Sequence, residues 1–321
     1  MYDVLTLGSA TKDLFLFLDN SSLKPGMKRH FLDIPIDKKI DIKDKLEFTG
    51  GSATNASATF AKFGKKTAVI ARVGNDSTGE FILNDLKDRG IDTNYVIKAT
   101  GQTPFTNILV SSNGEMVILV YRGIEKVWDE KDLNLDFKSK WLYIGTLPGD
   151  GYKLLPKILD YCEENDIKTV MNPGSVELSL KIKKMEGILH RLNIISMNDD
   201  EARSFVGYGN DINNILKMVK EVKDMAIITK GSLGSIVATK EKIYTANTFK
   251  TKQINFVGAG DAFLSGFVNA IMDSRSIEDA INLGSYNASS VIKQYGAKNG
   301  IVDHYPKNSL SIKTTIIPKS G

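Results

Sequence analysis

Strand-like and helix-like segments alternate along most of the 321-residue chain. Residues 4–7 and 168–171 are short apolar runs bounded by Gly8 or by Asn172-Pro173, a pattern typical of buried strands. Residues 52–63 and 199–206 carry apolar residues at helical spacing. Because strands that alternate with helices form parallel sheets covered on both faces, the chain is predicted to adopt an α/β fold with a mostly parallel central sheet flanked by helices.

Two segments interrupt this alternation. Residues 14–48 contain no convincing helix pattern, and residues 105–123 hold two apolar runs joined by Asn113-Gly114, a dipeptide that favours tight hairpin turns. We expect the two segments to pair as a small β-sheet lid beside the main sheet, because long insertions at strand ends are often functional. The alternative is a pair of extra edge strands without any lid motion.

Charge and apolar content limit the classes of partner that this chain is expected to bind. Lysine and arginine number 42 against 38 acidic residues, a net charge of +4, and the lysines are scattered. This distribution suits an anionic small molecule better than nucleic acid. The single cysteine, Cys162, excludes an internal disulfide, and no apolar run reaches the ~18 residues of a membrane span. We therefore expect a cytoplasmic protein with no nucleic-acid or membrane partner.

Residues 258–261, Gly258-Ala259-Gly260-Asp261, form a small-residue turn that enters an apolar helix. The backbone N–H groups at such a helix start bind anions. A carboxylate at the same place is explained if it takes a proton from a nucleophile while the N–H groups hold the charge of a transferring group. A simple helix cap at Asp261 explains the motif equally well at this stage.

A second turn of this kind precedes residue 52. Gly50 and Gly51 allow close approach of the backbone to a ligand, and Asn55, one turn into the helix, offers a donor and an acceptor. A helix start capped by Ser52 is the alternative, but it requires neither both glycines nor Asn55.

Together these stretches resemble the two signatures of the PfkB carbohydrate kinase family, which has the ribokinase-like fold. Gly50-Gly51, Asn55, Ala58 and Phe63-Gly64 are similar to its N-terminal signature, and residues 255–261 are similar to its C-terminal one, about 200 residues later. The matches between them include Gly74-Asn75-Asp76, Asn198-Asp-Asp-Glu201 and residues 229–234. The resemblance covers residues 1–305, which we expect to form one ribokinase-like, three-layer kinase domain, with residues 306–321 as a C-terminal tail.

The resemblance implies roles for individual residues. Asp261 resembles the family's catalytic base, with the backbone of Gly258, Ala259 and Gly260 as its anion hole. The residues implied to bind the acceptor are Asp13, Gly50, Gly51 and Asn55. Those implied to bind the nucleotide are Asn198, Lys230, Gly231, Gly234 and Asn287, with Glu201 on the metal side.

The implied activity is transfer of the ATP γ-phosphate to a hydroxymethyl group of a small sugar, with Mg²⁺. A nucleoside kinase of the same fold is the alternative, in which Phe15, Phe17 and Phe105 would stack on a base. A non-catalytic sensor is a third hypothesis, which the presence of Asp261 disfavours. No Gly-x-x-x-x-Gly-Lys-Ser/Thr motif occurs, which excludes the P-loop design.

Three further expectations concern departures from the pattern and assembly. Asn255 stands where cation-dependent members have Asp, so activation by a monovalent cation is not expected. Arg122 is either a surface arginine or a ligand for a substrate phosphate or carboxylate or for the ATP phosphates. Apolar residues on both faces of the lid strands suggest a homodimer formed through the lid.

Overall fold

The computed structural model describes residues 1–18, 36–37, 39–207 and 209–317. Its centre is a sheet of nine described strands, of which the six from β12 to β4 run parallel. The strands are, in spatial order, β15 (Ile312–Ile316), β14 (Lys242–Ala246), β13 (Ser235–Thr239), β12 (Met225–Thr229), β11 (Ile194–Asn198), β10 (Lys168–Met171), β9 (Ser139–Ile144), β1 (Tyr2–Leu7) and β4 (Thr67–Ile70).

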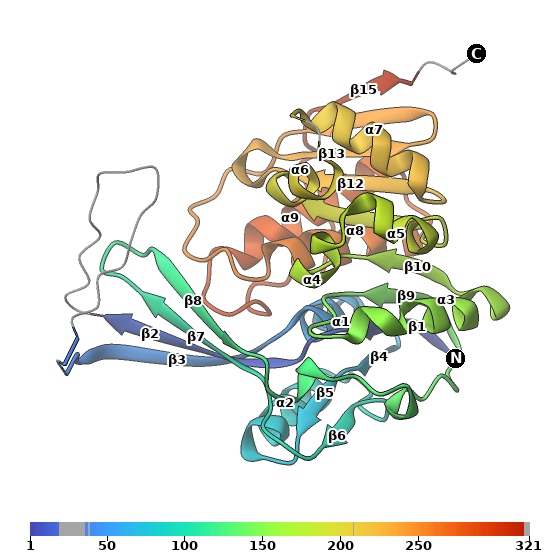
Figure 1. The fold of residues 1–321 in the computed structure, drawn as a ribbon. Helices are drawn as coiled ribbons and strands as arrows, with labels where there is room; N and C mark the ends of the chain where they lie inside the picture. The colour runs from blue at the N-terminus through green and yellow to red at the C-terminus, as the bar shows by residue number, and fades with distance from the viewer. Residues whose placement is uncertain (19–35, 38, 208, 318–321) are drawn as a thin grey trace.

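Helices cover both faces of this sheet, as Figure 1 shows. One face packs against α3 (Leu155–Glu164), α5 (Lys181–Leu189), α6 (Asp199–Val206) and α7 (Asp211–Glu221), and the other against α1 (Ser52–Lys62), α8 (Ala259–Met272) and α9 (Ile277–Val291). Side chains of successive strand residues alternate between the two layers, so that Leu142 belongs to the first core and Tyr143 to the second. The predicted three-layer α/β architecture is confirmed.

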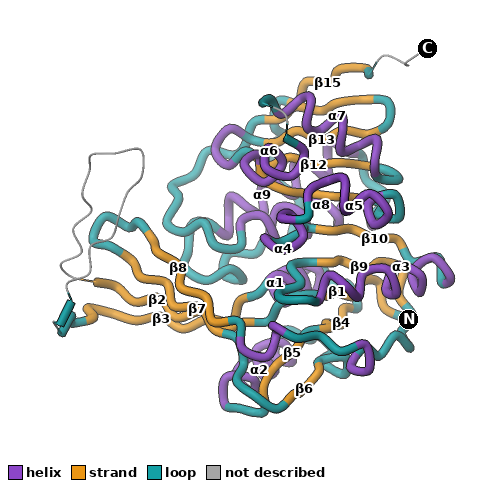
Figure 2. The backbone as a smooth tube through the Cα atoms, in the orientation of Figure 1, coloured by secondary structure: helices purple, strands orange, loops and turns teal. Residues whose placement is uncertain are grey.

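A second sheet lies beside the first and projects away from it (Figure 2). Its strands are, in spatial order, β3 (Ile42–Gly50), β2 (Thr11–Leu18), β7 (Phe105–Val110) and β8 (Met116–Tyr121). The two insertions thus pair through the neighbouring parallel strands β2 and β7, as the sequence predicts. Residues 19–35 and 38 of the predicted lid segment 14–48 lie outside the described residues.

The remaining elements are short or connect the two sheets. They are α2 (Ser77–Asp88), α4 (Ser175–Ser179), β5 (Arg72–Gly74), β6 (Ile97–Ala99) and the 3₁₀ turns at Gly123–Lys126, Glu130–Asp132, Gly151–Leu154 and Gly231–Leu233. No helix in the described part of the chain is long and apolar enough to cross a membrane.

One detail differs from the sequence expectations. The segment 306–321, expected to be a C-terminal tail, contains β15, which pairs with β14 at the sheet edge. The run at 67–73 is divided at Ala71 between β4, which pairs with β1, and β5, which pairs with β6. The last long helix, α9, ends at Val291.

The chain order places a switch point in the parallel sheet. From β1 the chain moves outward to β4, and it later returns to β9 on the other side of β1. In sheets of this kind ligands bind outside the carboxyl ends of the strands, where the order reverses. The loops after β1, β9, β10, β11 and β12 are therefore the place to look for a site.

Candidate functional site

A cavity of about 570 Å³ opens at these carboxyl ends. Its lining combines the loop after β1, the start of α1, the start of α8 and the underside of the small sheet. Eight of the residues expected at a site contribute to the lining together with all three residues of the expected anion hole. They are Asp13, Gly51, Asn55, Arg122, Asn198, Glu201, Gly231 and Asp261, with Gly258, Ala259 and Gly260. The two sequence signatures therefore meet in one place, although about 200 residues separate them.

Asp261 is the third residue of α8 and does not cap it. The helix N-cap is Gly258, which has φ 82° and carries no side-chain cap bond. A Cβ on Gly258 would lie 2.4 Å from Cβ of Ala297, so glycine is required there for packing as well as for its left-handed backbone. The simple capping explanation of Asp261 is thus wrong.

The carboxylate of Asp261 is held by two side chains from other elements. Nδ2 of Asn55 donates to Oδ2 at 2.9 Å, and the hydroxyl of Tyr143 donates to Oδ1 at 3.4 Å. Burial raises the pKa of Asp261 to about 6, against the two hydrogen bonds, which lower it. A carboxylate whose pKa approaches the working pH is suited to accept a proton.

The start of α8 offers fewer free N–H groups than the sequence implies. The N–H of Ala259 donates to the carbonyl of Phe256 at 3.2 Å. The N–H of Gly260 lies in the first helical turn, where no intrahelical acceptor exists. Of the three backbone groups expected to form an anion hole, Gly258 and Gly260 can therefore serve as donors without breaking an existing bond.

Tyr143 was not foreseen from the sequence. It is fully buried on β9, and it points into the layer of α1 and α8 because alternate residues of the strand face that side. Burial raises the pKa of its phenol well above the usual value, and the negative charge of Asp261 adds to this. The signal that could have found it is a hydroxyl in an otherwise apolar strand, since a buried hydroxyl needs a partner.

Asp13 lies near the start of β2, on the other side of the cavity. Its carboxylate accepts from Oγ1 of Thr11 at 3.0 Å, and burial raises its pKa. A Cβ on Gly50 would lie 2.0 Å from Oδ2 of Asp13, so the first glycine of the pair makes room for this carboxylate. Gly50 itself therefore contacts Asp13 rather than lining the cavity.

The second glycine brings α1 against the loop after β1. Gly51 has φ 99°, and a Cβ there would lie 2.4 Å from the carbonyl oxygen of Ser9. This close approach lets the N–H of Ser52 donate to Oγ of Ser9 at 2.9 Å, while Oγ of Ser52 accepts from the N–H of Thr146 at 2.9 Å. Ser52 thus joins the ends of β1 and β9 instead of capping its helix.

Asn55 has one amide atom still available. Its Nδ2 is used by Asp261, whereas the buried Oδ1 has no hydrogen-bond partner among the described residues. Because an unpaired buried acceptor is costly, this oxygen is placed to receive a donor from a ligand in the cavity. A hydroxyl held there would lie beside the Asp261 carboxylate.

Arg122 directly follows β8, lines the cavity and lies near two buried carboxyl groups. Burial raises the pKa of Glu125 to about 8 and also raises that of Glu177, and the Arg122 guanidinium opposes both shifts. Glu125 accepts from the N–H of Ala10 at 2.8 Å, which ties this corner to the loop after β1. Arg122 is therefore not a plain surface arginine, and Glu125 and Glu177 were missed from the sequence.

Asn198 and Glu201 form a reciprocal cap at the start of α6. The N–H of Asn198 donates to Oε2 of Glu201, and the N–H of Glu201 donates to Oδ1 of Asn198, each at 2.8 Å. Both side chains also line the cavity, and burial raises the pKa of Glu201. Carboxylate and amide oxygens are ligands that suit Mg²⁺.

A second cavity of about 690 Å³ adjoins the first, and Gly231, Phe256, Ala259 and Gly260 line both. Gly234 lines the second one. Two expected nucleotide ligands line neither. Lys230 pairs with Asp211 at 2.7 Å.

Asn287 is the second expected nucleotide ligand that lines neither cavity. It is fully buried, donates to the carbonyl of Ala262 at 2.8 Å and accepts from the N–H of Val302 at 3.1 Å. The face of α9 that lines the second cavity carries Ser285, Ala288, Ser289 and Ile292 instead. Asn287 therefore fixes the packing of α9 rather than facing the cavity.

Asn255, where the chain departs from cation-dependent relatives, is fully buried in the loop before α8. Its Oδ1 accepts from the N–H of Val257 at 2.8 Å, and its Nδ2 donates to the carbonyl of Gln294 at 3.4 Å. The side chain thus ties this loop to the end of α9 through neutral hydrogen bonds.

Comparison with known proteins gives consistent results. The family model described as pfkB family carbohydrate kinase matches residues 37–304. A ribokinase of Staphylococcus aureus is 28% identical, over 93% of this chain and 96% of that protein. Among solved structures, Arabidopsis thaliana ribokinase complexed with ribose and ATP has a TM-score of 0.78 at 19% identity, covering 94% of this chain and 96% of that one. The nucleoside kinase of Methanocaldococcus jannaschii has a TM-score of 0.76 at 22% identity, covering 93% and 94%.

Proposed function

Because this chain belongs to the pfkB family of carbohydrate kinases, we propose that it transfers the γ-phosphate of ATP to a hydroxymethyl hydroxyl of a small sugar. The observation that carries the proposal is the position of the α8 start. Ala259 and Gly260 line both cavities, and Asp261 faces the first. A donor in the second cavity and an acceptor in the first would meet at this turn.

In this scheme Asp261 accepts the proton of the attacking hydroxyl. The free Oδ1 of Asn55 and the carboxylate of Asp13 hold the acceptor's other hydroxyls. The N–H groups of Gly258 and Gly260 stabilise charge on the transferring phosphoryl group. Phosphoryl transfer depends on such positioning and charge stabilisation more than on covalent chemistry by the protein.

Mg²⁺ fits the oxygen donors at the first cavity. Glu201, with Asn198 beside it, would hold the ion, which supplies positive charge at the nucleotide phosphates. The capping bonds between the two residues fix both side chains in position before any ion arrives.

The lining of the first cavity favours a sugar over a nucleoside. Phe15 and Phe17, expected to stack on a nucleobase, pack against Tyr295 instead, and neither lines the cavity. The small sheet presents the aliphatic residues Ile108, Ile118 and Val120 there. A nucleoside kinase, the activity named for the M. jannaschii neighbour, is the alternative.

We also propose that Arg122 binds a phosphate or carboxylate of the acceptor. It lines the acceptor cavity and, among the described residues, no hydrogen bond or ion pair of its guanidinium is found. The guanidinium is close enough to the buried carboxyl groups Glu125 and Glu177 to oppose the rise that burial causes in the pKa of each. A bidentate contact with an oxyanion is what such a guanidinium provides.

An acceptor panel with ATP and Mg²⁺ tests both proposals. It should include ribose, fructose, fructose 6-phosphate, 2-keto-3-deoxygluconate, adenosine and cytidine. Activity confined to the anionic sugars, with KM raised at least tenfold by Arg122→Ala, is the expected result. Activity on adenosine or cytidine alone would overturn the sugar assignment, and an unchanged KM in Arg122→Ala would return Arg122 to a structural role.

The small sheet also offers a surface for a homodimer. Residues Val117 to Tyr121 of β8 are exposed although all are apolar or aromatic, and β8 is an edge strand. Ile118 and Val120 face the cavity, which leaves Val117, Leu119 and Tyr121 for a second copy. A dimer in solution that Leu119→Lys dissociates would support this assembly, and a monomeric wild type would refute it.

A further inference from the structure

Glu125 is a fully buried carboxyl group that has no role of its own in the scheme above. It lies in the 3₁₀ turn Gly123–Lys126, which directly follows Arg122 and strand β8 of the small sheet. Its Oε1 accepts from the N–H of Ala10 at 2.8 Å, whereas the buried Oε2 has no hydrogen-bond partner among the described residues. Because burying a carboxyl group is costly, its retention for this one side-chain bond calls for an explanation.

The turn that carries Glu125 is itself fixed in place. The backbone N–H of Glu125 donates to the carbonyl of Arg122 at 3.0 Å, and the N–H of Ile124 donates to the carbonyl of Gln102 at 3.2 Å. A Cβ on Gly123, which has φ 48°, would lie 2.2 Å from the same Gln102 oxygen, so glycine is required for the turn to pack this closely. The backbone of Glu125 therefore keeps a set position relative to that of Arg122.

The hydrogen-bond partner of this carboxyl group, Ala10, belongs to the loop after β1. It lies between Ser9 and Thr11, both of which line the acceptor cavity. Oγ1 of Thr11 donates to the Asp13 carboxylate at 3.0 Å. A Cβ on Gly51 would lie 2.8 Å from Cα of Ala10, so the start of α1 packs against the same loop. One bond therefore fixes the loop that leads to Asp13 and that receives the start of α1.

A carboxylate in a neighbouring segment shows what a purely structural bond of this kind looks like. Asp76 is the N-cap of α2, and it accepts from the N–H groups of Gly79 and Thr103, each at 2.8 Å. Neither Asp76 nor its two partners line the acceptor cavity. Glu125 differs from Asp76 because its partner stands between two residues that do.

We propose that Glu125 is a positioning residue for the acceptor: by accepting from the N–H of Ala10, it holds the loop that leads to Asp13 in a fixed position relative to Arg122. An acceptor whose hydroxyls contact Asp13 while its anionic group contacts Arg122 needs this spacing. The consequence for acceptor binding rests on the proposed function, whereas the hold of Glu125 on the loop is a property of the free protein.

Two replacements separate the bond from the volume of the side chain. Burial raises the pKa of Glu125 to about 8, so its neutral form predominates at pH 7. Glutamine is close in shape to that neutral form and keeps an oxygen for the N–H of Ala10. Methionine keeps a similar length but offers only a weak acceptor.

The kinetic test compares Glu125→Gln and Glu125→Met in the full chain at pH 7, with the best acceptor found in the panel above. Glu125→Met should raise the KM for this acceptor at least about tenfold, while kcat and the KM for ATP change less than about threefold, because uniform binding of the acceptor is lost. Glu125→Gln should stay within about twofold of wild type, since the bond is kept. Asp76→Ala is the matched control, which should lower the melting temperature and leave the KM for the acceptor unchanged.

A double-mutant cycle with Arg122→Ala gives a readout that a merely structural role would not move. If Glu125 acts by placing the loop relative to Arg122, Glu125→Met should raise the KM less than about threefold once Arg122 is absent. Effects of the two replacements that simply multiply would overturn the proposal. A KM that is unchanged in Glu125→Met, or raised as much in Glu125→Gln as in Glu125→Met, would also overturn it.

Hydrogen exchange of the Ala10 amide, measured by NMR in the free protein, tests the bond without any acceptor. The exchange should become at least about tenfold faster in Glu125→Met and stay near the wild-type rate in Glu125→Gln. If wild type phosphorylates no acceptor, the proposed function fails, and this exchange alone decides whether Glu125 holds the loop. Exchange as slow in Glu125→Met as in wild type would overturn the hold. If Glu125→Met does not fold, Glu125→Gln decides, because both its KM and its Ala10 exchange must remain near those of wild type.

Discussion

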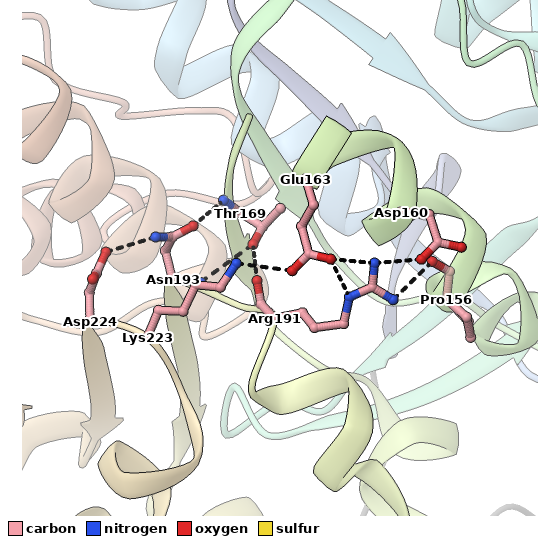
Figure 3. A network of polar contacts seen from close by, with 8 residues as sticks. All are labelled: Pro156, Asp160, Glu163, Thr169, Arg191, Asn193, Lys223 and Asp224. Carbon is pink, nitrogen blue, oxygen red and sulfur yellow. Dashed lines mark hydrogen bonds and ion pairs between the residues drawn. The ribbon is translucent and has the colours of Figure 1, made fainter. Parts of the chain in front are cut away.

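At the amino ends of the central strands Arg191 donates to Glu163 and Asp160 (Figure 3). At the carboxyl ends, by contrast, Asp13 and Asp261 line a cavity and have few hydrogen-bond partners. The first region also includes Lys223, which donates to Glu163 at 3.1 Å. Both regions join several strands of one sheet, so the difference between them does not come from the architecture.

The pKa directions separate the two edges. At the amino edge the hydrogen bond from Arg191 lowers the pKa of Glu163, so the fold favours its charged form. At the carboxyl edge burial raises the pKa of Asp13, Glu201 and Asp261, so the fold disfavours charge there. Carboxyl groups whose charged form is disfavoured cluster at functional sites, so the carboxyl edge is the place to look for a function.

The replacement Asp261→Asn is expected to have the largest effect, and it tests directly whether the carboxyl edge is catalytic. If Asp261 is the base, kcat should fall by about 10²–10⁴, the usual contribution of a positioned general base, while nucleotide binding persists. Turnover with an accepted sugar and calorimetric titration with ATP measure the two effects. Near-normal turnover in Asp261→Asn would contradict the role of Asp261 as the base.

The same variant carries a stability prediction with a fixed sign. The folded-state pKa of Asp261, about 6, exceeds the usual 3.8, so its ionised form costs stability at pH 7, and this cost disappears as the pH falls below both values. Asp261→Asn should therefore unfold at a higher temperature than wild type at pH 7, with a smaller gap at pH 4. A lower melting temperature at pH 7 would show that the carboxylate supports the fold.

A smaller effect is expected from Tyr143→Phe, which tests how the hydrogen bond from Tyr143 affects the pKa of Asp261. The Tyr143 bond lowers the pKa of Asp261, so its loss should move the acid limb of kcat/KM to higher pH and reduce turnover about three- to tenfold at pH 6. The pH profile from 5 to 9 measures this. A uniform loss at every pH would instead indicate damage to packing on β9.

The contrast between the edges also explains what the sequence could predict. Glycine motifs act locally, so Gly50, Gly51 and Gly258 indicated close approaches that the φ values and packing now account for. The layered sheet followed from the alternation of periodicities. The same local evidence suggested an N-cap at Asp261, which the helix boundary rules out.

Residues that act through tertiary contacts left little trace in the sequence. Tyr143 and Glu125 reach the site only because β9 and the turn after β8 come together with distant loops. The family resemblance implied that Asn287 binds the nucleotide, but its side chain bonds to Ala262 and Val302, and the neighbouring residues Ala288 and Ser289 line the second cavity instead. Helix faces and strand partners depend on the whole fold, which periodicity alone does not define.

The smallest effect is expected at the amino edge, from Arg191→Met. Arg191 is bonded to Glu163 and Asp160 and to the carbonyl of Pro156, and its stem packs where it is only about one-fifth exposed. A network of this kind at a partly exposed position contributes about 1 kcal/mol, so the melting temperature should fall by a few degrees while kcat stays unchanged. Lys223→Met, which removes one exposed partner of Glu163, is the matched control and should lower the melting temperature less.

The stabilisation by Arg191 should depend on pH. Because Glu163 has a lowered pKa, the stabilisation is present above the usual carboxyl pKa and is lost as acidification protonates Glu163. The difference in melting temperature between wild type and Arg191→Met should therefore shrink toward pH 3. A loss of turnover in Arg191→Met without a loss of stability would show that the two edges are coupled, and it would break the comparison from the side where we expect it to hold.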